Sequence, residues 1–219
     1  MPRRTPAHRA RRVATLVAVL VITLALGTSV VWASSRSASG KRVTSTSTPT
    51  GNRVLLVGDS LLWQSETQVT AALKLDGWDA TIAASPGTTI EGWAAKMAKL
   101  VAKNDPDVIV VELGTNNCTV DECPRIARAI DKLMRHVPKT TPVHWLNVQN
   151  QPTYPAHPES VNNALAAATD RWSNITLVDM SAHFRNHPEW HQDDGLHFTT
   201  TGSEQLAALM MNAVGTAPR

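Results

Sequence analysis

The stretch Val54–Leu61 has the sequence VLLVGDSL, an apolar run that stops at Gly58-Asp59-Ser60. A short run of large aliphatic residues bounded by glycine is typical of a strand buried on both faces. Ser60 follows this strand directly and precedes a segment with helical spacing. Its hydroxyl is therefore interpreted either as the cap that begins the helix or as a nucleophile presented at the strand end, and one residue can serve both roles.

Apolar runs of this kind recur along the chain and alternate with segments of helical spacing. The predicted strands are Arg53–Val57, Asp79–Ala83, Val108–Leu113, Val143–Val148 and Thr176–Val178. The predicted helices are Leu61–Leu75, Ile90–Lys103, Pro124–His136, Glu159–Arg171 and Gly202–Val214. This alternation predicts an α/β fold, a three-layer α/β/α sandwich with a five-stranded parallel sheet. Ligands of such sheets bind at the carboxyl ends of the strands, so functional residues should follow strands.

Charge is distributed unevenly along the 219 residues, whose formal net charge is +3. Residues 1–53 carry nine Lys or Arg and no acid, whereas residues 54–219 carry 12 basic and 18 acidic residues. The basic character therefore belongs to the N-terminal arm. The acidic remainder argues against a nucleic-acid-binding surface and against nucleic acid as a partner.

The arm predicts export. Residues 1–12 form a basic cytoplasmic segment, and Val13–Trp32 contains no charge over a length that spans a bilayer core. Residues 13–33 are interpreted as a transmembrane anchor, or as a signal peptide cleaved after the small residue Ala33. The domain that follows is expected outside the cell, held at the membrane by a single pass or secreted.

A spacer separates this segment from the folded domain. Residues 34–52 are rich in Ser and Thr and have no hydrophobic period, which is typical of a flexible linker. The folded domain is predicted to span residues 53–215, a length sufficient for one hydrophobic core.

Residues suited to chemistry follow the predicted strands. They form four short groups, each in a segment after a strand, as the fold requires. These groups are Gly58-Asp59-Ser60, Ser85-Pro86-Gly87, Gly114-Thr115-Asn116 and Asp194-Gly195-Leu196-His197.

Together the four groups resemble the sequence blocks of the SGNH hydrolases, also called the GDSL esterase/lipase family. The GDSL block is intact at Gly58–Leu61, the Gly-x-Asn block is Gly114–Asn116, and the Asp-x-x-His block is Asp194–His197. The remaining block is a single loop glycine, assigned to Gly87. The resemblance covers about residues 54–214, nearly the whole predicted domain.

The resemblance implies a role for each matching residue. Ser60 is the nucleophile, His197 the base that takes its proton, and Asp194 the acid that orients the imidazole. The oxyanion hole combines the backbone N–H groups of Ser60 and Gly87 with the side-chain amide of Asn116. A serine hydroxyl needs such a neighbouring base because it is otherwise a poor nucleophile. No metal and no cofactor are implied.

Other interpretations of single residues stay open on the sequence. Asn116 also suits an Asx turn, and Gly87 also suits the turn after Pro86. Asp59 is interpreted as structural, with a carboxylate that accepts loop N–H groups, and Asp193 as a solvated loop charge. Many family members have Asp where this chain has Asn117, a departure that concerns loop packing more than chemistry.

Two cysteines, Cys118 and Cys123, follow Asn116 closely. In an exported domain they are expected to form a disulfide, and its position suggests that it holds the oxyanion loop. Zinc binding is the alternative, but the chain lacks a second Cys pair.

Two of the seven tryptophans lie beside the predicted catalytic groups. Trp63 follows the nucleophile, and Trp190 precedes the Asp-His block. Core packing is the usual role of tryptophan, and stacking on a sugar of the substrate is the alternative.

The sequence thus predicts an exported serine esterase that hydrolyses carboxylic esters through an acyl-enzyme on Ser60. A domain tethered on the outer side of the membrane would meet cell-envelope polysaccharide, so the O-acetyl groups of such a polymer are the expected substrate. The resemblance to the family also implies lipid esters as a substrate class. Transfer of the acyl group to a sugar hydroxyl would use the same triad. A non-catalytic envelope-binding module is the alternative from another functional class.

Overall fold

The computed structural model describes residues 51–117, 125–149 and 158–215. The predicted segments 1–12 and 13–33, most of the linker, and both cysteines (Cys118 and Cys123) lie outside these ranges. Within the described ranges, no helix combines the length and apolar character that crossing a bilayer requires.

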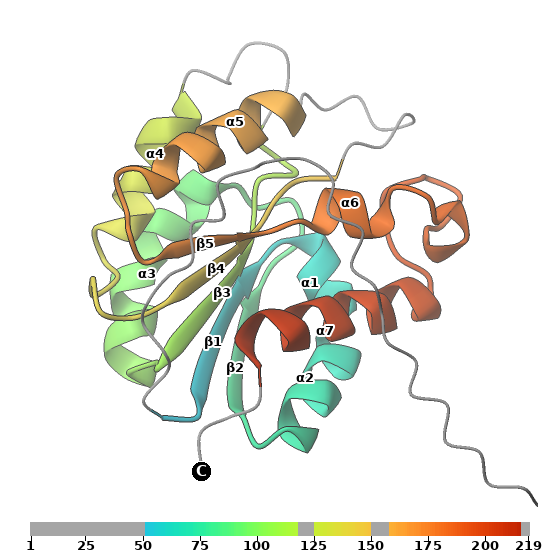
Figure 1. Ribbon diagram of the computed structural model, residues 1–219, viewed down its shortest axis with the longest axis horizontal. Helices are drawn as coiled ribbons and strands as arrows, with labels where there is room; N and C mark the ends of the chain where they lie inside the picture. The colour runs from blue at the N-terminus through green and yellow to red at the C-terminus, as the bar shows by residue number, and fades with distance from the viewer. Residues whose placement is uncertain (1–50, 118–124, 150–157, 216–219) are drawn as a thin grey trace, which may run out of the picture. The chain divides into compact units, whose positions relative to one another are not determined.

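Five parallel strands form one sheet in the order β2-β1-β3-β4-β5 (Figure 1). They are β1 (Arg53–Gly58), β2 (Asp79–Ala84), β3 (Val108–Glu112), β4 (Val143–Leu146) and β5 (Ile175–Val178). The prediction of a five-stranded parallel sheet is confirmed. This order is the flavodoxin-like one, in which the strand order reverses between β1 and β3, so that the loops after these strands frame a crevice.

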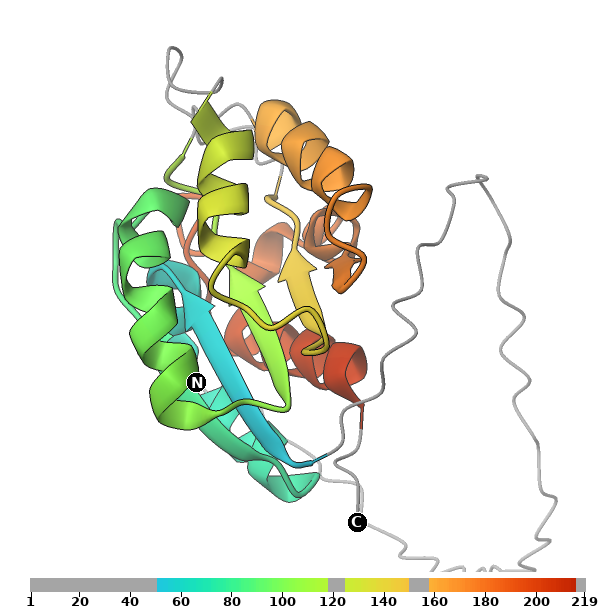
Figure 2. The same cartoon turned by 90° about the vertical axis from the view of Figure 1, so that its left-hand side faces the viewer.

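Helices cover both faces of the sheet and complete the predicted three layers (Figures 1 and 2). One layer consists of α3 (Ile90–Asn104), α4 (Ile126–Met134) and α5 (Pro158–Thr169). The other consists of α1 (Ser60–Gln64), α2 (Glu66–Leu75), α6 (Met180–Phe184) and α7 (Thr200–Val214). Alternate residues of β1 bury against different layers, Leu55 and Val57 against the first and Val54 and Leu56 against the second.

The predicted single helix Leu61–Leu75 is wrong, because Ser65 divides it into α1 and α2. Ser65 is fully buried, and its hydroxyl donates to Ser203 Oγ on α7 at 3.0 Å. The break between α1 and α2 thus coincides with a contact to α7. The short helix α6 was not predicted, and α4 begins later and ends earlier than the predicted Pro124–His136.

Strand register brings the ends of three strands level. Gly58, the last residue of β1, pairs with Ala84 on β2 and with Glu112 on β3. The loops that carry Ser60, Gly87 and Asn116 therefore leave the sheet at the same edge.

Candidate active site

A tight turn between β1 and α1 presents Ser60. A Cβ on Gly58 would collide with Leu62 Cβ, so only glycine allows α1 to pack this closely on β1. The prediction that Ser60 caps the helix is wrong: Asp59 is the cap, and its Oδ1 accepts the Leu61 N–H at 3.1 Å. Ser60 is the first helical residue, and its hydroxyl faces another element.

That element is the loop before α7. Asp194 Oδ1 accepts the backbone N–H groups of Leu196 and His197, each at 2.9 Å. Gly195 supplies the positive φ of 67° that this tight turn needs. The Gln192 N–H donates to the His197 carbonyl at 2.7 Å and closes the base of the loop. The imidazole of His197 is thereby held over its own Asp194.

Three of the predicted residues form one hydrogen-bonded chain. His197 Nδ1 lies 2.6 Å from Asp194 Oδ2, and His197 Nε2 lies 3.0 Å from Ser60 Oγ. Ser60 and His197 are 137 positions apart in the sequence. With a proton on Nδ1 that is donated to Asp194, Nε2 can accept the Ser60 hydroxyl proton, which is the arrangement that activates a serine.

The charge on Asp194 is stabilised by its neighbours. The hydrogen bond with His197, helped by the two backbone N–H groups, lowers the pKa of Asp194 from 3.8 to about 2. Asp194 therefore stays ionised from neutral pH down to strongly acidic solution and remains able to orient the imidazole.

Gly87 lies in a turn that fits type II geometry. Pro86 precedes it, Gly87 itself has φ of 70°, and the Thr88 N–H donates to the Ser85 carbonyl at 3.4 Å. The turn interpretation of Gly87 is thus confirmed. Its N–H takes no part in the hydrogen bond of the turn, so its predicted role as an oxyanion donor stays a prediction.

The amide of Asn116 is fixed by two acceptors. Nδ2 donates to Asp59 Oδ2 at 3.1 Å and to the Thr88 carbonyl at 3.1 Å. Both amide hydrogens therefore have partners in the free protein. An oxyanion is a stronger acceptor than the neutral Thr88 carbonyl, so it can take over one of these hydrogens while the Asp59 bond keeps the amide oriented.

Asn117 joins the loops after β2 and β3. Its Oδ1 accepts the Ile90 N–H at 2.9 Å, and its Nδ2 donates to Glu91 Oε2 at 2.7 Å. An aspartate here would face the Glu91 carboxylate. The presence of Asn117 where many family members have Asp is therefore explained by the neighbouring Glu91, which needs a donor. The difference concerns the packing of these loops.

Replacement of Asn116 by alanine is expected to lower kcat by about 100- to 1,000-fold with little change in KM, because its amide is the predicted side-chain donor of the oxyanion hole. Steady-state hydrolysis of p-nitrophenyl acetate measures this change, and thermal unfolding of the same sample checks that the fold is intact. Full turnover by a folded variant would remove Asn116 from the oxyanion hole.

The structure also brings together residues that were not predicted. Glu112 ends β3 and is 1% exposed, and its carboxylate accepts the N–H groups of Asp59 and Leu62. Its signal in the sequence is an acid at the end of the otherwise apolar run Val108–Val111. Burial of an unpaired carboxylate is costly, so a buried acid beside the turn that carries Ser60 must be hydrogen-bonded or protonated.

Of the two candidate substrate tryptophans, only Trp63 is open to solvent, with 55% of its surface exposed. Core packing is therefore not its role. Trp190 is half-buried, stacks on His187 at 3.6 Å between ring centroids, and packs against Phe184.

Comparison with known proteins identifies the family and agrees with the fold. Residues 56–205 match the model of the GDSL-like lipase/acylhydrolase family. A lipase/acylhydrolase from Enterococcus faecalis has the same fold, with a TM-score of 0.65 at 19% identity over 74% of this chain and 95% of that one. The C-terminal catalytic domain of Streptococcus pneumoniae peptidoglycan O-acetyltransferase A has a TM-score of 0.60 at 19% identity, over 77% and 97%.

A Bacillus subtilis (strain 168) protein named "Putative peptidoglycan O-acetyltransferase" is 24% identical over 168 residues, which are 75% of this chain. The match covers 24% of that relative, so this chain corresponds to about a quarter of its length. The resemblance noted in the sequence is confirmed by the family match, which spans most of the predicted domain. The chain belongs to the GDSL-like lipase/acylhydrolase family.

Proposed function

We propose that this chain is an exported serine esterase that hydrolyses O-acetyl groups of cell-envelope polysaccharide through an acyl-enzyme on Ser60. The observation that carries the proposal is the hydrogen-bonded chain from Asp194 through His197 to Ser60, with distances of 2.6 and 3.0 Å.

In the first step, His197 Nε2 removes the Ser60 proton while Oγ attacks the ester carbonyl. The negative charge on the carbonyl oxygen is met by the N–H groups of Ser60 and Gly87 and by the Asn116 amide. The tetrahedral intermediate collapses, His197 returns the proton to the leaving alkoxide, and an acetyl group stays on Ser60. Asp194 stabilises the charged imidazole between these two proton transfers.

In the second step, water takes the place of the alcohol. His197 removes a proton from water, which attacks the acetyl-Ser60 carbonyl, and the collapsing intermediate returns the proton to Ser60 Oγ. Acetate leaves, and the free serine is restored.

The names of similar proteins support the substrate class. The Bacillus subtilis relative and the Streptococcus pneumoniae domain are both named as peptidoglycan O-acetyltransferases. The expected membrane segment at residues 13–33 and the linker after it would place the domain beside such a polymer. These names also favour a second candidate function, transfer of the acetyl group from Ser60 to a sugar hydroxyl.

Labelling with a fluorophosphonate tests the shared mechanism. The wild-type protein is expected to be labelled at Ser60, and Ser60→Ala to stay unlabelled. Hydrolysis and transfer are then separated by incubating an acetyl donor with and without a sugar acceptor and by quantifying free acetate and acetylated sugar. A folded sample that is not labelled would favour the non-catalytic binding module.

An open surface hollow lies beside α1, the helix that begins with Ser60. Trp63 lies three residues after Ser60 on α1, and together with Glu66, Thr67, Thr70 and Ala71 it lines an open hollow of about 510 Å³. An exposed aromatic side chain among polar groups offers a flat face for a sugar ring.

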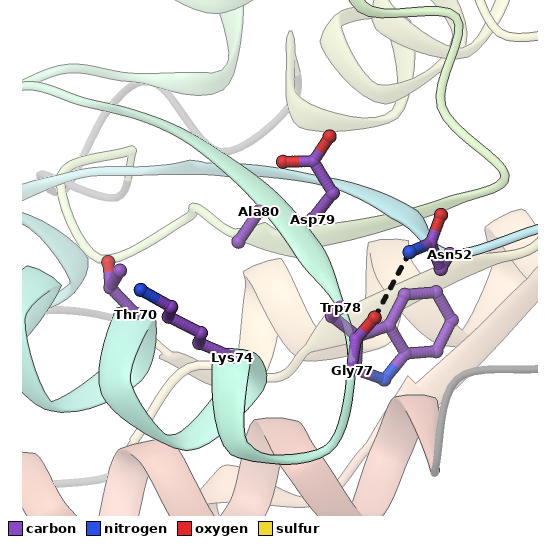
Figure 3. A pocket seen from close by; sticks show the side chains of 7 residues that line it. All are labelled: Asn52, Thr70, Lys74, Gly77, Trp78, Asp79 and Ala80. Carbon is purple, nitrogen blue, oxygen red and sulfur yellow. Dashed lines mark hydrogen bonds between the residues drawn. The ribbon is translucent and has the colours of Figure 1, made fainter.

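A second hollow adjoins the first along α2, and the two together are called the groove here. Thr70 lines both, and the second hollow has a volume of about 460 Å³ (Figure 3). Figure 3 shows Thr70 and Lys74 of α2 with Asp79 and Ala80 at the start of β2 around it. We infer that a glycan chain bound at Ser60 extends over Trp63 toward this hollow.

Replacement of Trp63 by alanine is expected to raise KM for an O-acetylated glycan polymer by about 5- to 10-fold, because one aromatic contact is worth about 1–1.5 kcal/mol. The rate with p-nitrophenyl acetate should not change, since this small ester does not reach the groove. Leu75→Ala is the control: Leu75 is 87% exposed and lines neither hollow. Equal effects of Trp63→Ala on both substrates would contradict the groove.

A further inference from the structure

Two carboxyl groups are buried together directly beside the nucleophile turn. Asp59 is 0% and Glu112 is 1% exposed. They come from the ends of adjacent parallel strands, because Glu112 pairs with Gly58, the residue before Asp59. Neither side chain has a basic partner among the hydrogen bonds and ion pairs of the described residues, and the Asp59 N–H donates to the Glu112 carboxylate at 3.3 Å.

Two adjacent buried carboxyl groups cannot both ionise without a large electrostatic cost, so the pair keeps one proton at neutral pH. Burial and the Asp59 charge raise the pKa of Glu112 well above 4.5, and burial raises the pKa of Asp59 to about 6. His197, in the loop before α7, is the other titratable group that acts on Asp59, and it favours the Asp59 carboxylate.

Hydrogen bonds assign the proton to Glu112. Both oxygens of Asp59 accept N–H groups, Oδ1 from Leu61 at 3.1 Å and Oδ2 from Asn116 at 3.1 Å. Glu112 accepts its two N–H groups, from Asp59 and Leu62, on Oε2 alone, each at 3.3 Å. Its other oxygen, Oε1, takes no part in these two bonds and can therefore carry a proton and donate it to the Asp59 carboxylate.

We propose that Glu112 is a positioning residue of the active site: its protonated carboxyl group donates to the Asp59 carboxylate and so fixes the Asn116 amide and the first turn of α1. The consequence for catalysis rests on the proposed function. Through Leu62 and Asp59, Glu112 holds the backbone on both sides of Ser60. Through Asp59 it orients the amide that is expected to meet the oxyanion.

Isosteric amides test this assignment. A glutamine side chain can donate to Asp59 and accept from Leu62, so Glu112→Gln should keep kcat within about threefold of wild type. Glu112→Leu removes both functions and should lower kcat by about 10- to 100-fold at nearly constant KM. Asp59→Asn should lower kcat by at least about 10-fold, because it replaces the charged acceptor of the Asn116 amide with a neutral group.

Ser65→Ala is the matched control for the kinetics. Ser65 is equally buried and joins the start of α2 to α7 through Ser203, and its side chain bonds there rather than to Asn116 or Asp59. Its loss should lower the melting temperature and leave kcat unchanged at temperatures where the variant is folded. If Asp59→Asn is as active as Glu112→Gln, or if Glu112→Leu is as active as the wild type, the proposal is overturned.

The melting temperature measured as a function of pH tests whether Glu112 is protonated, and it requires no enzymatic activity. Glu112 has a raised pKa in the folded state, so its favourable contribution is complete below about pH 4.5 and is lost as pH rises toward the folded pKa. Glu112→Gln has no such loss, so its melting temperature should rise relative to wild type as pH increases above about 5. A constant difference over this range would contradict the protonated Glu112, whether or not the protein proves to be an esterase.

Discussion

Replacement of His197 by alanine is expected to lower kcat/KM for an ester by about four to six orders of magnitude. His197 Nε2 is the acceptor 3.0 Å from Ser60 Oγ, and its removal leaves the hydroxyl without a base. The effect should appear in kcat, because the residues proposed to bind the substrate are unchanged. Steady-state hydrolysis of p-nitrophenyl acetate measures it.

The fold should survive this change. The His197 side chain is about one-third exposed, and the loop is held mainly by backbone groups, including the Gln192 N–H bond to the His197 carbonyl. The circular dichroism spectrum and melting temperature of His197→Ala should therefore stay close to those of the wild type. A folded variant that keeps near-native esterase activity would refute the assignment of His197 as the base.

Replacement of Asp194 by asparagine is expected to lower kcat by about 10⁴-fold with little loss of stability. In Asp194→Asn the side-chain carbonyl oxygen can still accept the N–H groups of Leu196 and His197, which places the new NH₂ group against His197 Nδ1. Nδ1 must then accept a hydrogen bond, and the imidazole proton moves to Nε2. In this tautomer Nε2 donates to Ser60 and cannot take its proton.

The pH profile checks the role of Asp194. The His197 hydrogen bond lowers the pKa of Asp194 to about 2, so its stabilising contribution is present above about pH 4 and is lost as pH falls toward 2. Loss of wild-type activity at moderately acidic pH must then come from protonation of another group, while Asp194 remains charged. Asp194→Asn should therefore be impaired throughout the neutral range. Recovery of its activity at any pH between about 5 and 9 would contradict the tautomer argument.

The strand pattern of this chain could be predicted because a parallel strand buried on both faces must be apolar over most of its length. Arg53–Gly58 and Val108–Glu112 show this property, and the predicted bounds differ by at most one residue. The last strand residues then locate the functional loops, since parallel strands end at one edge. Ser60, Asn116 and Gly87 follow this rule, and the structure brings their loops to the same edge.

Boundaries and polar partners were harder to predict because they depend on contacts across the fold. Ser65 ends α1 where its hydroxyl meets Ser203, 138 positions away. Asp59 caps α1 in place of Ser60, and the Ser60 hydroxyl faces His197. No local pattern in the sequence contains either contact, since both form only when α7 and its preceding loop pack against the first helices.

The layer architecture, the family and the identity of the residues that could perform acyl chemistry follow from the amino-acid sequence without any coordinates, because periodicity and motif order are local properties of the chain. Which atoms meet is a property of the folded molecule. Folding places His197 beside the hydroxyl of Ser60 in the stretch VLLVGDSL. It also leaves the Trp63 side chain in solvent and buries Glu112 beside Asp59. These outcomes depend on distances between segments far apart in the chain, and burial sets the charge of such an acid pair only after the chain has folded.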